Sequence, residues 1–356
     1  MTKLQLFSWG ANSHGQLGLG YESEMCTTPT KVSPETSVDL SEIFQIRCGG
    51  GHIIILDKNY GLHACGWNNK GQLGLNSIND SYIIKALSGF SARIIDMACG
   101  WDSSAAIDEN GQLFVWGSNA FEQLGFSAKN NVLHFKKPVI LNLPCNEKVQ
   151  KVSFGLRFMC ILCDCGTVYV IGRWKYTEQF EALYHNDTNF YRLLPNHSEI
   201  KQISSGSNHI VCVDNSNSVI GFGDNKFSQR EKQSLKKEKI KSLRSGWTHN
   251  GILTENGSVY LWGRNSYGQL GCSNIEALSC LSKLKGIEGK ITNLHLGSEH
   301  GMVVNENGTV YTWGWNEHGN CGNGNETNVF VPYRVCLPGK CIMSATGAGF
   351  CFALVQ

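Results

Sequence analysis

The chain has 356 residues and a formal net charge of +2, and 41% of its residues are apolar while 17% are charged. This balance excludes an intrinsically disordered chain, and it excludes a global electrostatic attraction to nucleic acid or to an anionic membrane. The 40 glycines, against 7 prolines, indicate a fold with many tight turns.

The first predicted elements are a lone strand over residues 4–10, LQLFSWG, and a polar loop over residues 12–18. From Gly49 onward the chain repeats one longer unit. Each copy opens with Gly-x-x-His or an equivalent, continues through an apolar run, turns at polar residues, and returns as a strand that ends in Trp-Gly or an equivalent. Apolar, β-branched runs on both sides of such a turn predict a β-hairpin.

The copies of this hairpin are regularly spaced. The opening glycine recurs as Gly49, Gly100, Gly155, Gly206, Gly246, Gly297 and Gly347. The strand-ending glycine recurs as Gly10, Gly66, Gly117, Gly172, Gly223, Gly263 and Gly314. In six copies the two glycines are 17 residues apart. A unit repeated at this period predicts a single repeat domain over residues 1–356.

The two ends of the chain complement each other. The strand over residues 4–10 has no hairpin partner of its own, and the hairpin that Gly347 opens stops after one strand, at Gln356. An open solenoid gains nothing from matching ends, whereas in a propeller a blade shared by both ends removes the seam. The sequence therefore predicts an all-β, seven-bladed β-propeller whose N- and C-terminal strands share one blade.

A polar loop with a Gln-Leu-Gly ending follows most strand-ending glycines. We interpret this loop as framework, in which Leu fills the core between blades, Gly permits the turn, and Asn or Gln side chains bond the backbone. The tryptophans at one blade position are interpreted as packing residues. These are Trp9, Trp116, Trp262 and Trp313.

Two units depart from the pattern. The unit with Gly172 lacks Gln-Leu-Gly, and the unit with Gly223 leads into a run from Arg230 to Arg244 that contains seven Lys or Arg and two Glu. We interpret this run as a solvated loop, and a patch for an acidic partner or for nuclear import is the alternative.

The 15 cysteines are scattered over repeat positions, so we expect reduced thiols and not a disulfide framework. Cys160, Cys163 and Cys165 form a Cys-x-x-Cys-x-Cys run, but on a strand Cys160 and Cys163 point to opposite faces and no second pair matches them. No metal site, cofactor or catalytic residue is predicted.

Several longer runs resemble the regulator of chromosome condensation family, whose repeats form seven-bladed propellers. They are LFSWGANSHGQLGLG from Leu6, CGWD from Cys99, SGWTH from Ser245, GSEH from Gly297 and WGWNEHGNCGNGNETNV from Trp313. Together they resemble most the guanine nucleotide exchange factors of this family that act in secretion. The resemblance covers essentially the whole chain and implies a GTPase regulator.

The residue just before each histidine position varies between copies while the histidine framework is constant, which is typical of recognition loops. The histidines themselves, His52, His209, His249 and His300, are interpreted as framework residues that bond neighbouring backbone. The pre-histidine residues are Gly51, Asp102, Arg157, Asn208, Thr248, Glu299 and Gly349. The resemblance implies that acidic and histidine side chains at this position contact a Ras-like GTPase and help to expel its nucleotide.

The predicted partner-binding set follows from that position and from two neighbouring tryptophans. It is Trp101, Asp102, Arg157, Asn208, Trp247, Thr248 and Glu299. We expect these loops to emerge together at one end of the ring.

The resemblance thus implies an exchange factor for a Ras-like small GTPase, in control of secretion, and not a covalent enzyme. A scaffold that uses the same face without discriminating nucleotide states is the alternative. A chromatin-binding regulator would need a basic face or tail, and a tryptophan-based light sensor is suggested only by Gly246-Trp247-Thr248-His249. We expect a soluble monomer with no membrane insertion and no direct nucleic acid contact, in the cytoplasm, with the nucleus as the alternative.

Overall fold

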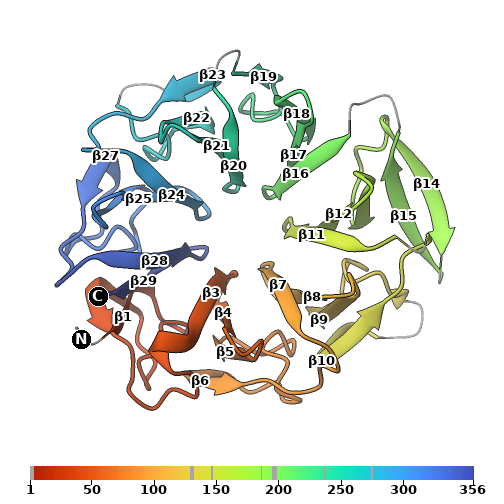
Figure 1. Ribbon diagram of the computed structural model, residues 1–356, viewed down its shortest axis with the longest axis horizontal. Coiled ribbons are helices and arrows are strands. Elements are labelled where there is room, and N and C mark those ends of the chain that lie inside the picture. The colour runs from red at the N-terminus through yellow and green to blue at the C-terminus, as the bar shows by residue number, and fades with distance from the viewer. Residues whose placement is uncertain are drawn as a thin grey trace.

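A computed structural model of the chain describes residues 4–128, 132–145, 147–185, 187–194, 199–235, 238–273 and 276–356. Over these residues the chain forms seven antiparallel sheets that stand around a common axis as the blades of a propeller (Figure 1). The all-β, seven-bladed architecture predicted from the repeats is confirmed.

The blades are numbered here from the first opening glycine, Gly49. Blade 1 contains β3 (Ile43–Cys48), β4 (His52–Asp57), β5 (Leu62–Gly66) and β6 (Ser81–Ala86), and the short 3-10 helix η1 (Leu40–Glu42) precedes it. Blade 2 contains β7 (Ile94–Cys99), β8 (Ser103–Asp108), β9 (Leu113–Ser118) and β10 (His134–Leu141). Blade 3 contains β11 (Val149–Phe154), β12 (Phe158–Cys163), β13 (Val168–Gly172), β15 (Thr188–Leu193) and β14 (Phe180–His185), in that order across the sheet.

The second half of the ring follows the same plan. Blade 4 contains β16 (Ile200–Ser205), β17 (His209–Asp214), β18 (Ser218–Gly223) and β19 (Gln233–Ser234). Blade 5 contains β20 (Ile240–Ser245), β21 (His249–Thr254), β22 (Val259–Arg264) and β23 (Ala277–Lys283). Blade 6 contains β24 (Ile291–Leu296), β25 (His300–Asn305), β26 (Val310–Gly314) and β27 (Val329–Arg334). Blade 7 contains β28 (Cys341–Thr346), β29 (Phe350–Val355), β1 (Gln5–Ala11) and β2 (Met25–Lys31).

Blade 7 is built from both ends of the chain. Strand β1 pairs with β29 in a continuous antiparallel register from Gln5 opposite Val355 to Gly10 opposite Phe350. The two ends therefore lie side by side, in the red and blue ribbon at the lower left of Figure 1. This is the shared blade that the complementary ends of the sequence predict.

The apolar core lies between the blades. The buried apolar residues of the described chain form seven clusters, and each cluster draws on two neighbouring blades. Burial of one face of a sheet against the next is what a blade of four short strands needs for stability, since it cannot cover its own apolar surface.

Tryptophan side chains tie neighbouring blades together at a repeated position. The indole Nε1 of Trp116 in blade 2 donates to the carbonyl of Gln72, in the loop of blade 1, at 2.9 Å. Trp262, Trp313 and Trp9 donate in the same way to Gln229, Gln269 and Asn320. All four indoles are fully buried, which confirms that they are packing residues.

The unit that lacks Gln-Leu-Gly fills its core differently. Trp174 lies directly after Gly172 and Arg173, and its side chain is buried against Phe158 and Phe180 in the cluster between blades 3 and 4. Its indole Nε1 donates to the carbonyl of Tyr176 at 2.8 Å. An indole thus occupies the space that Leu fills between other blades.

Removal of residues 1–10 should destabilise the whole ring, because it strips β1 from between β29 and β2 and removes the buried side chains of Leu6 and Trp9. Deletion of one large buried side chain costs about 2–5 kcal/mol, so we expect a loss of at least about 3 kcal/mol. Denaturant unfolding measures this loss. Substitution of the exposed Gln356 by Ala is the control, and an unchanged midpoint after the deletion would refute a structural role for the shared blade.

Candidate functional site

The Gly-x-x-His turns are held closed by one backbone hydrogen bond and one packing contact. In the turn of blade 6, the Gly297 N–H donates to the carbonyl of His300 at 2.9 Å. The imidazole of His300 lies so close to Gly297 that a Cβ there would overlap the ring. Phe158 and Phe350 pack on Gly155 and Gly347 in the same manner. Blade 2 is the exception, because Ser103 has no ring and Phe154 packs on Gly100 instead. In the other six turns the position requires a ring of the right shape more than it requires an imidazole.

Three of the histidines link their blade to the next through a second side chain. The Nε2–H of His52 donates to Ser104 Oγ at 2.9 Å, and that hydroxyl donates to the carbonyl of Gln72 at 2.7 Å. His209 is linked in the same way through Asn250, and His300 through Cys351. These contacts support the framework role of the histidines. The direct partner of each of the three, however, is a side chain of the next blade and not the neighbouring backbone that the sequence led us to expect.

His249 lacks this link. The equivalent of Ser104 is Gly301, which carries no side chain, and a Cβ there would overlap the indole of Trp313. Neither ring nitrogen of His249 has a hydrogen-bond partner among the described residues. Its Nδ1 lies 3.9 Å from Glu299 Oε2, but burial lowers the pKa of His249 to about 3, so the ring is neutral and forms no ion pair.

The turns form a circle around the mouth of the central channel. The Trp247 N–H donates to the carbonyl of Ser298, Ser298 N–H to that of Ala348, and Ala348 N–H to that of Gly49. Further bonds run from Leu156 to Ser207, from Ser207 to Trp247, and from Gly50 to Gly100. The recognition loops therefore emerge at one end of the ring, held by backbone contacts that do not depend on their side chains.

The pre-histidine residues differ in exposure. Arg157 and Asn208 are exposed, Asp102 and Thr248 are half-buried, and Glu299 is only 7% exposed. A residue of the predicted partner-binding set should be exposed to a partner, and Glu299 does not meet this requirement.

Glu299 is buried because its carboxylate is surrounded by donors from the neighbouring blade 5. Thr248 Oγ1 lies 2.8 Å from Oε1, Gln269 Nε2 donates to Oε2 at 2.6 Å, and an Arg264 nitrogen lies 3.7 Å from Oε1. Burial raises the pKa of this carboxyl, and the three neighbours act in the opposite direction.

The hydrogen bond that the Asp102 carboxylate accepts from Ser103 is longer than those that Glu299 accepts. The carboxylate lies 3.5 Å from Ser103 Oγ and also interacts with the hydroxyl of Ser118. Burial raises the pKa of this carboxyl, while hydrogen bonds and the charge of Lys70 lower it. Of the two predicted carboxylates, Asp102 is therefore the one with more capacity for an external partner.

Two predicted tryptophans meet across the channel mouth. The rings of Trp101 in blade 2 and Trp247 in blade 5 lie 5.3 Å apart, tilted by 48°. These blades are not neighbours, so the pair bridges the ring axis and covers one end of the channel.

A groove of about 480 Å³ opens beside this pair, on the face that carries the turns. Of the predicted residues, Trp101, Trp247 and Glu299 line it. Arg157 lies elsewhere, 4.7 Å from the ring centre of Phe121, and Thr248 reaches the groove only through its bond to Glu299. Asp102 and Asn208 do not line the groove.

Most of the aromatic side chains that line the groove are outside the predicted partner-binding set. The groove is also lined by His14, Trp67, Tyr267, Trp315 and His318. His14 stacks on Trp67 at 5.0 Å, and Trp315 packs edge-on against His318 at 4.9 Å. A signal existed: these residues stand one and four places after a strand-ending glycine, where the copies vary as much as they do before the histidine.

The polar loop that carries them is rigid. Asn68 Oδ1 accepts from Leu73 N at 2.9 Å and Gln72 Oε1 accepts from Lys70 N at 2.9 Å, so both amides bond the loop's own backbone. The same pair of contacts recurs around Leu17, Leu124 and Leu270, which are buried. The framework interpretation of this loop is confirmed for these copies, and its variable positions are displayed on a fixed support.

The structure offers no obvious site for a metal. Among the described residues, no group of three or more His, Cys, Asp or Glu side chains could hold an ion. Cys160 and Cys163 lie in different inter-blade clusters, on opposite faces of β12, and Cys165 is exposed. No helix in the described part of the chain is long and apolar enough to span a membrane.

Within the charged run from Arg230 to Arg244, Lys236 and Lys237 lie outside the described residues, and the remainder is only partly a solvated loop. Lys232, Lys239 and Lys241 are exposed, but Ile240–Ser245 is the inner strand of blade 5. Arg244 lines the central channel. The interpretation of the run as a loop is therefore wrong for its last residues, which include the charged residues Lys241 and Arg244.

Comparison with known proteins identifies relatives over the whole chain. A family profile described as an RCC1-like domain matches residues 5–353. The secretion-regulating guanine nucleotide exchange factor of Bos taurus is 32% identical over 100% of this chain and 84% of its own length. The Mus musculus protein of the same name is 30% identical over 99% of this chain and 83% of its own length.

The fold is also similar to solved structures. Prp20p from Saccharomyces cerevisiae superposes with a TM-score of 0.87 at 22% sequence identity, over 99% of this chain and 91% of Prp20p. At this level of identity the similarity concerns the fold alone.

Glu299→Ala should destabilise the protein by about 1–3 kcal/mol, because it leaves the buried donors of Thr248 and Gln269 without an acceptor. Glu317→Ala, at an exposed side chain of the same groove, is the control and should change stability by less than about 0.5 kcal/mol. Melting curves compare the two. Equal stability of the two variants would show that the Glu299 contacts contribute nothing to the fold.

Stability should fall as the pH falls from about 6.5 towards 4. Burial lowers the pKa of His52, His249 and His295 to about 3 and that of His209 and His300 to about 4. The unfolded chain therefore binds more protons than the native protein below pH 6.5, at up to about 1.4 kcal/mol per pH unit for each histidine. The raised carboxyl pKa values of Asp102 and Glu299 act in the opposite direction but involve fewer groups.

His249→Phe tests how much one buried histidine contributes to this pH dependence. Phenylalanine already occupies the equivalent position at Phe158 and Phe350, so the ring contact with the opening glycine is retained. Denaturant unfolding at several pH values should show that the unfolding free energy of His249→Phe depends less steeply on pH and is little changed at pH 7. His249→Ala should be less stable than the wild type at every pH. A pH-independent unfolding free energy would contradict the buried neutral state.

Proposed function

The chain belongs to the RCC1-like domain family, and we propose that it binds a Ras-like small GTPase through the face of the Gly-x-x-His turns and promotes release of its nucleotide. The relatives that support this are named guanine nucleotide exchange factors and align over essentially the whole chain. Because the same names specify secretion, we extend the proposal to a GTPase that acts there.

The observation that carries the proposal is the aromatic groove on that face. Trp, Tyr and Arg are the side chains that most often dominate binding energy at protein interfaces, and they do so in pockets at the centre of the contact. Here Trp67, Trp101, Trp247, Trp315 and Tyr267 surround one groove. Arg264 lies 4.7 Å from the ring centre of Tyr267, which holds its cation at the rim.

The support of the groove suits this role. The aromatic side chains stand on loops whose backbone is bonded internally, and the turns are joined to each other around the channel mouth. Little ordering of the loops is then needed when a partner binds, so less of the interaction energy is lost.

Exchange requires no bond-making by the propeller. If it binds the nucleotide-free GTPase more tightly than the loaded one, the affinity of the GTPase for its nucleotide falls by the same factor in the complex. A carboxylate can produce that difference by competing with the phosphates for the phosphate-loop lysine of the GTPase.

We assign that role to Asp102 and not to Glu299. The Glu299 carboxylate is saturated by Thr248, Gln269 and Arg264, so it shapes the groove from within. The Asp102 carboxylate is half-buried, and the hydrogen bond that it accepts from Ser103 is long. No cation lies within 4.0 Å of it among the described residues, so contact with a lysine would offset the cost of its burial.

A nucleotide-release assay tests the proposal. Purified Ras-superfamily GTPases are loaded with a fluorescent GDP analogue, and its release is followed with and without the protein. We expect acceleration for at least one GTPase. Trp67→Ala and Trp315→Ala should weaken binding by about 10-fold or more, since a central interface aromatic contributes about 2 kcal/mol or more. Asp102→Asn should reduce the maximal release rate more than it reduces binding.

Matched controls lie on other surfaces. Tyr184→Ala removes an exposed aromatic on the outer strand β14, and Asp164→Asn removes an exposed carboxylate at the β12–β13 turn, at the opposite end of the blade. Both should act like the wild type. A GTPase that binds while its nucleotide is released at the spontaneous rate would favour the scaffold, and no binding across the panel would overturn the proposal.

A further inference from the structure

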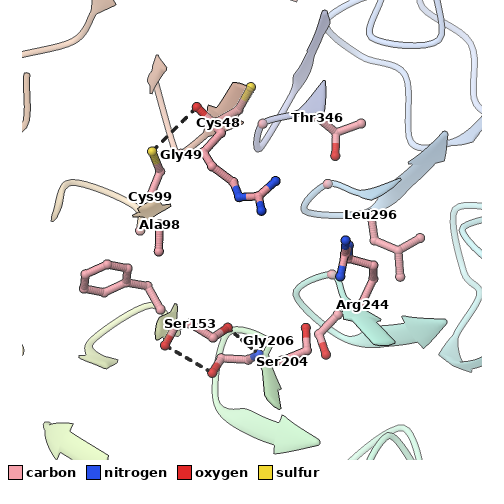
Figure 2. Close-up of a pocket in the computed structure, with 18 of the residues that line it drawn as sticks. Cys48, Gly49, Ala98, Cys99, Ser153, Ser204, Gly206, Arg244, Leu296 and Thr346 are labelled. Carbon is pink, nitrogen blue, oxygen red and sulfur yellow. Dashed lines mark hydrogen bonds between the residues drawn. The ribbon is translucent and has the colours of Figure 1, made fainter. Parts of the chain in front are cut away.

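The central channel is lined by one residue position repeated seven times. The residues two places before each opening glycine lie on the inner strands and contribute to the channel wall. They are Arg47, Ala98, Ser153, Ser204, Arg244, His295 and Ala345. Together with their neighbours they enclose a cavity of about 250 Å³ on the axis (Figure 2), and Trp101 and Trp247 also line it.

This cavity carries an excess of positive charge. Arg47, Lys151 and Arg244 line it, from blades 1, 3 and 5. Among the described residues, Asp96 is the one carboxylate paired with them, and Arg47 and Lys151 share it. The channel therefore contains three cations against one carboxylate, although the whole chain is almost neutral.

Arg244 is the cation without a carboxylate. Its guanidinium projects into the space at the centre of the ring (Figure 2), and Nη1 donates to the carbonyl of Leu243 at 2.9 Å. No described carboxylate lies within 4.0 Å of it. Burial and the charge of Arg47 lower the pKa of Arg244 to about 10, so the group remains charged at neutral pH.

Neutral groups around the cations add hydrogen-bond donors. Ser245 lines the cavity, and its buried hydroxyl has no partner among the described residues. Ser153 and Ser204 contribute further hydroxyl groups to the wall. His295 adds no charge, because burial and both arginines lower its pKa to about 3, and its Nε2 lies 3.0 Å from Ser344 Oγ.

We propose that the central channel binds a small oxyanion of the phosphate type between Arg47 and Arg244. Like charges in a confined, partly buried space repel each other, and an anion between them removes that repulsion. A guanidinium offers a planar fork of donors that matches the oxygens of a phosphate, and a free hydroxyl such as that of Ser245 donates to the same group. The cavity is smaller than most sites for whole organic ligands, which favours a single phosphate-sized group.

Binding of inorganic phosphate tests the proposal. Isothermal titration calorimetry and thermal melting are carried out with sodium phosphate, against sodium chloride at equal ionic strength. We expect saturable binding and a concentration-dependent rise in melting temperature for the wild type. Arg244→Gln should weaken binding at least 10-fold and should not lower the melting temperature in phosphate-free buffer, because it removes a repelled charge.

Two further variants keep the test decisive. Ala98→Asp adds a carboxylate at the same ring position in blade 2, so it should abolish phosphate binding while all three cations remain, even if Arg244→Gln does not fold. Arg334→Gln removes an exposed arginine from the outer strand β27 with the same change of net charge and should bind phosphate like the wild type. Equal effects of phosphate and chloride, or undiminished binding by Arg244→Gln or Ala98→Asp, would overturn the proposal.

Discussion

In six of the seven turns, the contact between the opening glycine and the ring three residues later is the constraint on which the rest of the structure depends. In blade 2 residue 103 is Ser, and Phe154 packs on Gly100 instead. The contact closes the turn, and it brings the turn's backbone to the channel mouth, where the turns of blades 3 to 7 and blade 1 bond one another in sequence. Histidine and phenylalanine both satisfy it, because the requirement is one of shape. Since the turn is held by backbone and ring, the side chain before the ring is free to vary.

The fold could be predicted because its determinants are local and repeated. The paired glycines, the Asn and Gln of the polar loop and the buried tryptophans each act within one blade or between neighbours, so their spacing in the sequence reports the architecture. The core of the unit with Gly172 could not be predicted from this spacing. Its core is completed by Trp174, which reaches the space between blades from a different position, and an extra strand, β14, lies at its outer edge.

The site was predictable only in part, because it depends on contacts between distant segments. That Glu299 is buried follows from Thr248 and Gln269, which approach it from blade 5 only when the ring is assembled. The contact of Trp101 with Trp247 crosses the axis, and the charge of Arg244 belongs to the channel although in sequence it ends a basic run. Spacing along the chain indicates which positions vary, but it does not show which of them converge.

The proposed exchange activity requires that the face of the turns distinguish the nucleotide states of a GTPase. The most direct measurement is the equilibrium dissociation constant of the protein for one responsive GTPase, prepared nucleotide-free and loaded with GDP and magnesium. Linkage predicts tighter binding to the nucleotide-free form, by the same factor by which the protein lowers the affinity for GDP. Equal dissociation constants for the two forms would contradict the account, because a protein that binds both states equally cannot shift the equilibrium between them.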